Sequence, residues 1–307
     1  MNILVTGGAG FIGSHIVNTY IEAGHSVSVV DNLSSGKLKY LNSKAKFFEM
    51  DILNPKISEI LKNEKINAIN HHAAQISVSE SFTDPLFDAN SNIIGTLQLL
   101  QSAVSLGVEK FIFASTGGAI YGEQNYFPAD EDHPTQPLSP YGISKLSVEN
   151  YLGFFNKQHG LSTVVLRYSN VFGPHQNPSG EAGVVAIFCE RLLRDQNPII
   201  FGDGKQTRDF ISVSDIAQAN LIALDRSCTG TFNVATGKET SVNFLAETLL
   251  RVSSKKNLAD HGPARQGDQS RSVISYKKFH ESFGWQPEVS LEQGLIETYS
   301  FFQNQTT

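Results

Sequence analysis

Residues 2–13 read NILVTGGAGFIG, an apolar run followed by a turn in which Gly7, Gly10 and Gly13 recur at every third position. The apolar run predicts a strand, and apolar residues at helical spacing from Phe11 onward predict an amphipathic helix. Glycines let a backbone turn tightly and approach a pyrophosphate, whose charge is favoured at the N-terminus of the following helix. The stretch therefore predicts a turn that binds the phosphates of a dinucleotide.

A second predicted strand, residues 26–30, ends at Asp31. An acidic residue about 20 positions beyond a phosphate-binding turn accepts hydrogen bonds from the adenosine ribose hydroxyls. The charge of such a residue repels a 2′-phosphate. Asp31 therefore favours NAD over NADP as the cofactor.

Composition narrows the class of protein. The 307 residues exceed the usual size of a single core, which predicts a large lobe and a smaller one. The net charge of −6 argues against nucleic-acid or anionic-membrane partners, and no apolar run approaches the ~20 residues of a membrane span. Cys189 and Cys228 give neither a disulfide framework nor a metal-binding spacing. With the glycine turn too close to Met1 for a signal peptide, we expect a cytoplasmic enzyme.

Strand and helix patterns alternate through the first half of the chain, which predicts an α/β fold with a doubly wound parallel (Rossmann) sheet. The regularity ends after residue 170, where proline and glycine become frequent. We therefore predict an NAD-binding domain at 1–170 and a smaller C-terminal substrate-binding lobe at 171–307, with segments near 209–237 returning to the first domain. The predicted strands are 2–5, 26–30, 46–51, 68–71, 111–114 and 163–167, and the predicted helices include 57–61, 92–106 and 139–156.

Tyr141 and Lys145 are four residues apart on a predicted helix and share one of its faces. A phenol has an ordinary pKa of about 10, too high for a base at neutral pH. A nearby ammonium, together with a positive nicotinamide ring, favours the phenolate. Ser115 and Thr116 end the preceding predicted strand and offer hydroxyl groups. This constellation predicts acid–base catalysis beside a nicotinamide.

With these motifs the chain resembles the extended short-chain dehydrogenase/reductase superfamily, and within it the nucleotide-sugar epimerases of the UDP-glucose 4-epimerase type. The resemblance covers nearly the whole chain. It includes the stretches HAA at 72–74, NIIGT at 92–96, LRYSNVFGP at 166–174, GDGKQTRDF at 202–210 and RQGD at 265–268.

The resemblance implies that NAD is the cofactor. Asp51 and Ile52 would hold the adenine, and Lys145 would bind the nicotinamide ribose. The full set of implied cofactor-binding residues is Gly7, Gly10, Phe11, Ile12, Gly13, Asp31, Asn32, Asp51, Ile52, Ala73, Ala74, Asn92, Tyr141, Lys145 and Tyr168.

The resemblance also implies the catalytic groups. Tyr141 would be the base and Lys145 its partner. In related epimerases a Tyr-Gly pair follows the loop after this strand, and the residue four positions before that tyrosine carries an assisting hydroxyl. In this chain the pair is Tyr121-Gly122, and the matching residue is Gly117. A shift of one residue would give Thr116 this role, and Ser115 is the alternative.

For the substrate, a UDP-sugar, the resemblance implies that Asn170 contacts the sugar diphosphate. Arg208 and Arg265 would clamp the diphosphate, since a guanidinium matches phosphate geometry. Asp268 would accept from the uridine ribose. Ser272 would line the sugar pocket, where a small residue admits a 2-acetamido group.

The loop after Thr116 separates the reactions of this superfamily. Related dehydratases carry an Asp-Glu pair there, and carboxyl-losing enzymes carry an acid, whereas this chain has Gly117 and Gly118. We therefore predict an NAD-dependent 4-epimerase of UDP-glucose and UDP-galactose, with UDP-GlcNAc and UDP-GalNAc as further substrates. The alternatives are a UDP-glucuronate 4-epimerase, another nucleotide-sugar-modifying enzyme of this superfamily, or a non-catalytic NAD sensor.

Members of this family usually form homodimers by pairing two helices, here 92–106 and 139–156. Apolar residues on these helices suit such pairing, although burial in the core explains them equally well: Leu97, Leu99, Leu100, Val148 and Leu152. We expect no metal site, because His71 and His72 are adjacent on a strand end and point to opposite faces.

Overall fold

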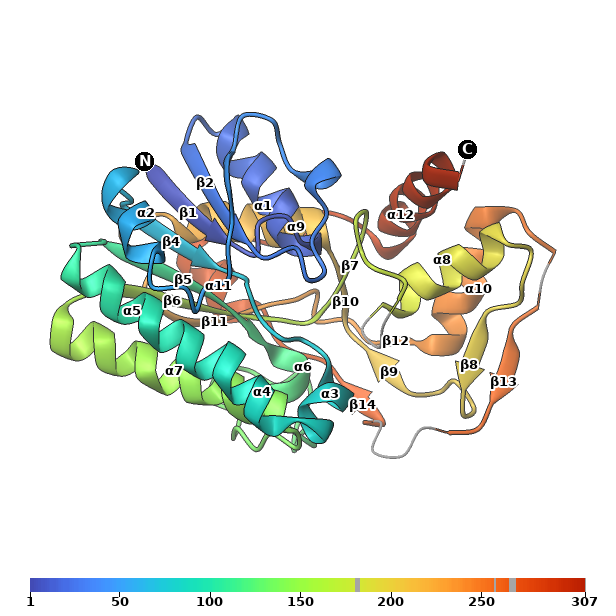
Figure 1. Cartoon of the computed structure of the whole chain (residues 1–307). Coiled ribbons are helices and arrows are strands. Elements are labelled where there is room, and N and C mark those ends of the chain that lie inside the picture. Colours follow the sequence, from blue (N-terminus) through green and yellow to red (C-terminus); the bar gives the residue numbers. More distant parts are fainter. Residues whose placement is uncertain (180–182, 257, 265–268, 307) are drawn as a thin grey trace. The chain divides into compact units, whose positions relative to one another are not determined.

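The computed structural model describes residues 1–179, 183–256, 258–264 and 269–306. The chain divides into two compact units, and each unit is assembled from three separate segments (Figure 1). Unit 1 comprises Met1–Gly122, Thr135–Arg167 and Ala217–Phe232, and unit 2 comprises Glu123–Pro134, Tyr168–Ile216 and Asn233–Thr307.

Unit 1 contains a seven-stranded sheet in the order β11-β6-β5-β4-β1-β2-β3. The glycine-turn strand β1 pairs in parallel with β2 on one side and with β4 on the other. This arrangement confirms the predicted doubly wound parallel sheet. The strands are β1 Asn2–Thr6, β2 Ser26–Asp31, β3 Lys46–Glu49, β4 Ala68–His71, β5 Lys110–Thr116, β6 Ser162–Tyr168 and β11 Gly230–Val234.

Helices cover both faces of this sheet (Figure 1). On one face α5 packs against α2 and α7. On the other face, Tyr20 of α1 donates its hydroxyl to the carbonyl of Asn220 in α9 at 3.1 Å. The bounds are α1 Phe11–Glu22, 3-10 helix η1 Leu38–Tyr40, α2 Ile57–Asn63, α3 Val78–Thr83, α4 Pro85–Ala89, π-helical segment η2 Asn90–Ile94, α5 Gly95–Ser105, α6 Gly117–Ile120, α7 Pro140–His159 and α9 Val213–Ala223.

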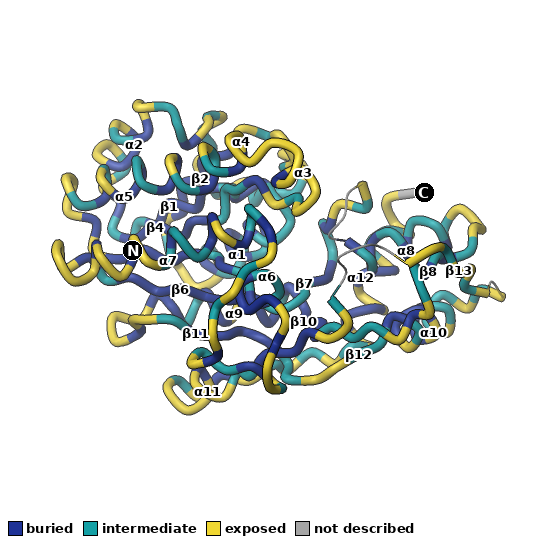
Figure 2. The backbone as a smooth tube through the Cα atoms, turned by 90° about the horizontal axis from the view of Figure 1, so that it is seen from below, coloured by how far each residue is buried: buried dark blue, intermediate teal, exposed yellow. Residues whose placement is uncertain are grey.

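One apolar core of unit 1 lies between the sheet and the α2–α5–α7 layer. In Figure 2 the strands are mostly buried, and the helices are exposed along their outer turns. Of the apolar residues named for helix pairing, four are buried in this core and Leu97 packs against it. The four buried side chains are therefore explained by the core. Other apolar residues of these helices are exposed by 42–52%: Ile94, Ile143, Tyr151 and Phe154.

Unit 2 combines short sheets of two or three strands with helices α8, α10 and α12, which pack on one another around an apolar core. Its strands are β7 Asn170–Phe172, β8 Ile199–Phe201, β9 Thr207–Arg208, β10 Phe210–Ser212, β12 Thr240–Ser241, β13 Asp260–Gly262 and β14 Arg271–Ser272. Its helices are α8 Val184–Leu193, α10 Val242–Ser253, α11 Lys277–Phe283 and α12 Leu291–Thr306.

Across the described ranges, none of the helices has both the length and the apolar character that a membrane crossing requires. The two cysteines, Cys189 and Cys228, are free and buried.

Candidate active site

The glycine turn of unit 1 leaves no room for side chains. Gly7 has a φ of +68°, and a Cβ there would lie 2.7 Å from the backbone nitrogen of Ala73. A Cβ on Gly13 would lie 2.2 Å from the carbonyl oxygen of Gly7. The N-terminus of α1, with Phe11 and Ile12 as its first residues, follows directly. The turn is thus closed tightly against the end of β4, the geometry in which backbone and helix terminus approach a phosphate.

Acidic and amide groups gather at the ends of β2 and β3. The buried carboxylate of Asp31 accepts backbone N–H groups from Ala9 at 3.0 Å and Leu33 at 2.8 Å. The exposed Asn32 donates its amide to the carboxylate of Asp51 at 2.8 Å. Three of the predicted adenosine-binding residues therefore lie close together at the carboxyl edge of the sheet.

Two other predicted cofactor residues are buried. The side chain of Ile52 belongs to the unit 1 core. The side-chain amide of Asn92 accepts from the backbone N–H of Gln75 at 3.0 Å and donates to its carbonyl at 2.9 Å. Asn92 thereby fixes the segment that directly follows Ala73 and Ala74.

Helix α7 carries both predicted catalytic side chains of unit 1. Ser139 caps its N-terminus by accepting the backbone N–H of Gly142. The Nζ atom of Lys145 lies 5.8 Å from the centre of the Tyr141 ring. It donates to the carbonyl of Ala114 at 3.0 Å and lies 4.7 Å from the centre of the Phe113 ring. The pair therefore faces the end of β5.

Burial shifts the pKa of both groups. It lowers the pKa of Lys145 to about 8, against the opposing charges of Asp88 and Glu149. It also raises the pKa of Tyr141 above its ordinary value, and the charge of Asp88 adds to this rise. The pKa of the phenol is thus raised, whereas the sequence led us to expect that Lys145 would help to lower it.

The two candidate hydroxyls at the end of β5 have different surroundings. Ser115 donates to the carboxylate of Glu149 at 2.5 Å. Glu149 also binds Arg167 at 2.6 Å, and Arg167 donates to the Tyr121 hydroxyl at 2.9 Å. The Ser115 hydroxyl is thus held in a buried ion-pair network, whereas Thr116 is partly exposed at the end of the strand.

In unit 2, strands β9 and β14 run side by side, and Arg208 and Ser272 are direct partners in their register. Ser272 is buried and Arg208 is partly exposed. The guanidinium of Arg208 donates to the carbonyls of Thr207 and Gln269, each at 2.8 Å. Ser272 therefore lies in a strand beside an arginine and not on a surface loop.

The remaining predicted substrate residues, and the predicted cofactor residue Tyr168, are placed as follows. Asn170 donates its backbone N–H to the carbonyl of Asp209 at 2.8 Å, which puts it beside the residue that follows Arg208. Tyr168 is buried at the end of β6. Arg265 and Asp268 lie outside the described residues.

Residues 3–235 match the family model described as the NAD dependent epimerase/dehydratase family. The chain belongs to this family. The predicted superfamily and the predicted cofactor, NAD, are thereby confirmed.

Solved structures of similar proteins cover the chain from end to end. A UDP-glucose 4-epimerase of Thermotoga maritima, crystallised with UDP-glucose, is 48% identical with a TM-score of 0.96, covering 100% of both chains. A UDP-glucose 4-epimerase of Thermus thermophilus, in complex with NAD, is 40% identical with a TM-score of 0.94, covering 99% of both. A UDP-N-acetylglucosamine 4-epimerase of Methanobrevibacter ruminantium, in complex with UDP-N-acetylmuramic acid, is 36% identical with a TM-score of 0.94, covering 99% of this chain and 98% of the other.

This member of the epimerase/dehydratase family has buried polar residues around α7 that were not predicted from the sequence. Asp88, Ser144, Glu149 and Arg167 all lie within hydrogen-bonded clusters of unit 1. Only Glu149 carried a usable signal, because it lies one helical turn beyond Lys145 on the same face.

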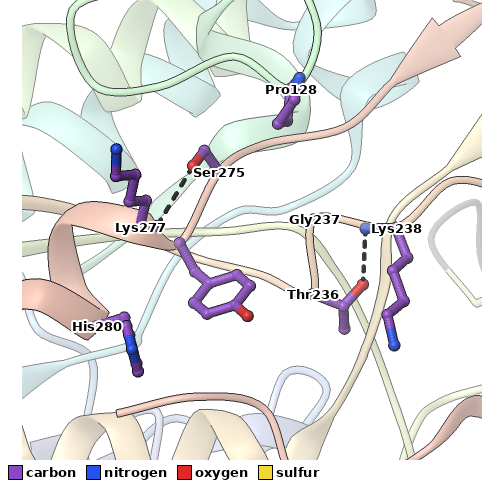
Figure 3. A pocket seen from close by; sticks show the side chains of 8 residues that line it. Pro128, Thr236, Gly237, Lys238, Ser275, Lys277 and His280 are labelled. Carbon is purple, nitrogen blue, oxygen red and sulfur yellow. Dashed lines mark hydrogen bonds between the residues drawn. The ribbon is translucent and has the colours of Figure 1, made fainter. Parts of the chain in front are cut away.

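A separate pocket of about 380 Å³ lies within unit 2 (Figure 3). Near it the backbone N–H groups of Lys238 and Lys277 donate to the hydroxyls of Thr236 and Ser275. The lining differs from the predicted site: Pro128, Thr236, Gly237, Lys238, Ser275, Tyr276, Lys277 and His280. In the portion of this family member that the structure describes, no cluster of three or more His, Cys, Asp or Glu side chains could hold a metal ion.

Proposed function

We propose that this protein is an NAD-dependent 4-epimerase that interconverts UDP-glucose and UDP-galactose through a 4-keto intermediate. The observation that carries the proposal is the pairing of Tyr141 with Lys145, whose ammonium bonds to β5. Strand β5 ends at Thr116 and is followed by Gly117 and Gly118 of α6. Epimerisation needs a base and a hydride acceptor, whereas dehydration needs further acids that this segment does not carry. The UDP-sugar epimerases among the similar structures support the same reaction.

The chain offers a cradle that fits NAD. A Cβ at Gly7 or Gly13 would collide with neighbouring backbone atoms, so this tight turn requires glycine at both positions. A turn of this kind lets the backbone approach a pyrophosphate. Asp31 is positioned by two backbone N–H groups and keeps lone pairs for the ribose hydroxyls. Asn32 and Asp51 would lie beside the adenosine, and Lys145 would bind the nicotinamide ribose.

Bound NAD would supply a reversible hydride acceptor for the sugar C4, with no net redox change over the reaction. The protein moves the proton. The positive nicotinamide ring of bound NAD would favour the phenolate form of Tyr141 against the effect of burial. The Tyr141 phenolate takes the proton of the 4-hydroxyl and later gives it back to the same oxygen. Thr116 donates a hydrogen bond to that oxygen, and the Lys145 ammonium stabilises the phenolate.

The diphosphate anchors the substrate while the keto-sugar turns over to present its other face. Arg208 would bind the diphosphate, with Asn170 beside it and with Arg265 and Asp268 completing the nucleotide contacts. Ser272, the neighbour of Arg208 across β9 and β14, would face the sugar. Because serine is small, UDP-GlcNAc and UDP-GalNAc fit the proposal as further substrates.

The test is turnover of purified protein with UDP-galactose, UDP-GlcNAc and UDP-glucuronate, using substrate that carries deuterium at C4. Conversion with the label kept at C4 of the product is the expected result. Label released into water would mean deprotonation at carbon and would contradict the mechanism. Turnover of UDP-glucuronate alone would favour the alternative epimerase, and no turnover with tightly bound NAD would favour a sensor.

We further propose that the protein acts as a homodimer in the cytoplasm. The outward face of α7 exposes Ile143 by 52%, Tyr151 by 42% and Phe154 by 52%, beside Ile94 of η2. Burying these side chains against a second copy would remove an apolar surface from water. Sedimentation of wild type and Phe154→Glu tests the dimer, which the variant should weaken.

A further inference from the structure

Asp88 is a fully buried carboxylate on the short helix α4 of unit 1. A buried carboxylate needs compensation from hydrogen bonds or from a positive charge. Within the described residues its donors are neutral groups from three other segments. The Ser144 hydroxyl donates at 2.5 Å, the Asn92 amide at 3.0 Å and the Gln75 amide at 3.2 Å.

The contact with Ser144 brings Asp88 to the catalytic face of α7. Ser144 directly precedes Lys145 and lies three residues after Tyr141, so all three residues share one side of the helix. The charge of Asp88 raises the pKa of both Tyr141 and Lys145. Two carboxylates, Asp88 and Glu149, raise the pKa of Lys145, and Asp88 has the larger effect.

The other charged groups around this face are already compensated or neutral. From α7, Glu149 forms a buried ion pair with Arg167 of β6, with both side chains 7% exposed. From the end of β4, burial and the charge of Lys145 lower the pKa of His71 and hold that of His72 at about 3, so both rings are neutral. Asp88 is therefore the carboxylate whose negative charge acts mainly on the Tyr141–Lys145 pair.

We propose that Asp88 is a positioning residue of the reaction, an inference that rests on the proposed function. Through Ser144 its carboxylate fixes the face of α7 that carries the catalytic side chains, and its buried charge keeps the Lys145 side chain in the ammonium form. Asp88 touches neither substrate nor cofactor in this role.

The test compares pH profiles of kcat for three variants of the NAD-loaded protein. Asp88→Asn keeps the shape and removes the charge, and Ser144→Ala removes the link to α7 but keeps the charge. Asp84→Asn is the matched control, because this exposed residue caps α4 and asparagine caps helices equally well.

Removing a negative charge lowers the pKa of both Tyr141 and Lys145, so both limbs of the Asp88→Asn profile should move to lower pH by about one unit. Ser144→Ala should lower kcat while both limbs stay in place, and Asp84→Asn should match wild type. Unmoved limbs in Asp88→Asn would overturn the inference. Should that variant not fold, Asp88→Ser provides the same comparison.

A readout without turnover separates this inference from the proposed function. Absence of epimerase activity in wild type would refute the proposed function. The phenolate absorbance of Tyr141 would still be measurable, with Tyr141→Phe as the blank. In a titration through the neutral and alkaline range, Asp88→Asn should show the phenolate at lower pH than wild type. Coincident titration curves would overturn the role of Asp88.

Discussion

Tyr141→Phe is the sharpest test of the catalytic assignment. The substitution removes one oxygen from a partly buried ring on α7 and keeps the ring beside Lys145, whose Nζ atom lies 5.8 Å from its centre. The free energy of unfolding should therefore change by no more than the roughly ±0.5 kcal/mol typical of mild substitutions. At about 2–4 °C per kcal/mol, this predicts a melting temperature within about 2 °C of wild type.

Catalysis should fall much further. A positioned general base supplies roughly 10²–10⁴-fold in rate, which corresponds to about 3–5 kcal/mol of activation free energy. Because phenylalanine cannot hold the proton of the 4-hydroxyl, kcat should fall by this factor with little change in KM. The assay is conversion of UDP-galactose to UDP-glucose, followed by a coupled dehydrogenase.

Tyr151→Phe is the control, since it makes the same substitution on the same helix at a side chain that is 42% exposed. It should keep wild-type kcat. If Tyr141→Phe retains more than about a tenth of wild-type kcat, Tyr141 is not the base and the reasoning fails.

Further predictions concern the cofactor, the sugar, the buried ion pair and pH. Purified protein should carry NAD, and Asp31→Ala should weaken its retention, measured as NAD released by dialysis. Ser272→Tyr should abolish activity on UDP-GlcNAc and spare UDP-galactose; equal loss on both would show that this residue does not gate the pocket. Arg167→Met leaves the buried carboxylate of Glu149 without its cation, which should cost about 3–5 kcal/mol of folding stability and lower the melting temperature by about 10 °C, measured by calorimetry. Because burial lowers the pKa of Lys145 to about 8, kcat should decline as pH rises past that value and the ammonium is lost.

The parts of the site that are contiguous in sequence could be predicted. The strand, glycine turn and helix around Gly7 are one uninterrupted stretch, and the spacing of Tyr141 and Lys145 lies within one helix. Local geometry fixes both, because a strand and a helix repeat with known periods. The alternation of strands and helices then determined the parallel sheet.

The parts of the site that depend on contacts between residues far apart in the sequence could not be predicted. Ser115 is held by Glu149, 34 residues away, and Asp88 bonds to Ser144, 56 residues away. No periodicity in the sequence encodes such contacts. The pKa of Tyr141 also depends on how completely the folded chain removes water from the phenol and on the charge of Asp88, which is distant in sequence; the spacing of Tyr141 and Lys145 reveals neither.

The interleaving of the two units has a consequence for biosynthesis. Strand β11, at the edge of the unit 1 sheet, ends at Val234 of a 307-residue chain, and the last segment of unit 1 begins only at Ala217. A nascent chain on the ribosome therefore holds an unfinished sheet, with the β6 edge unpaired, until about three quarters of the protein has been translated. Truncation before this point should yield a chain prone to aggregation, since an open sheet edge pairs readily with other chains.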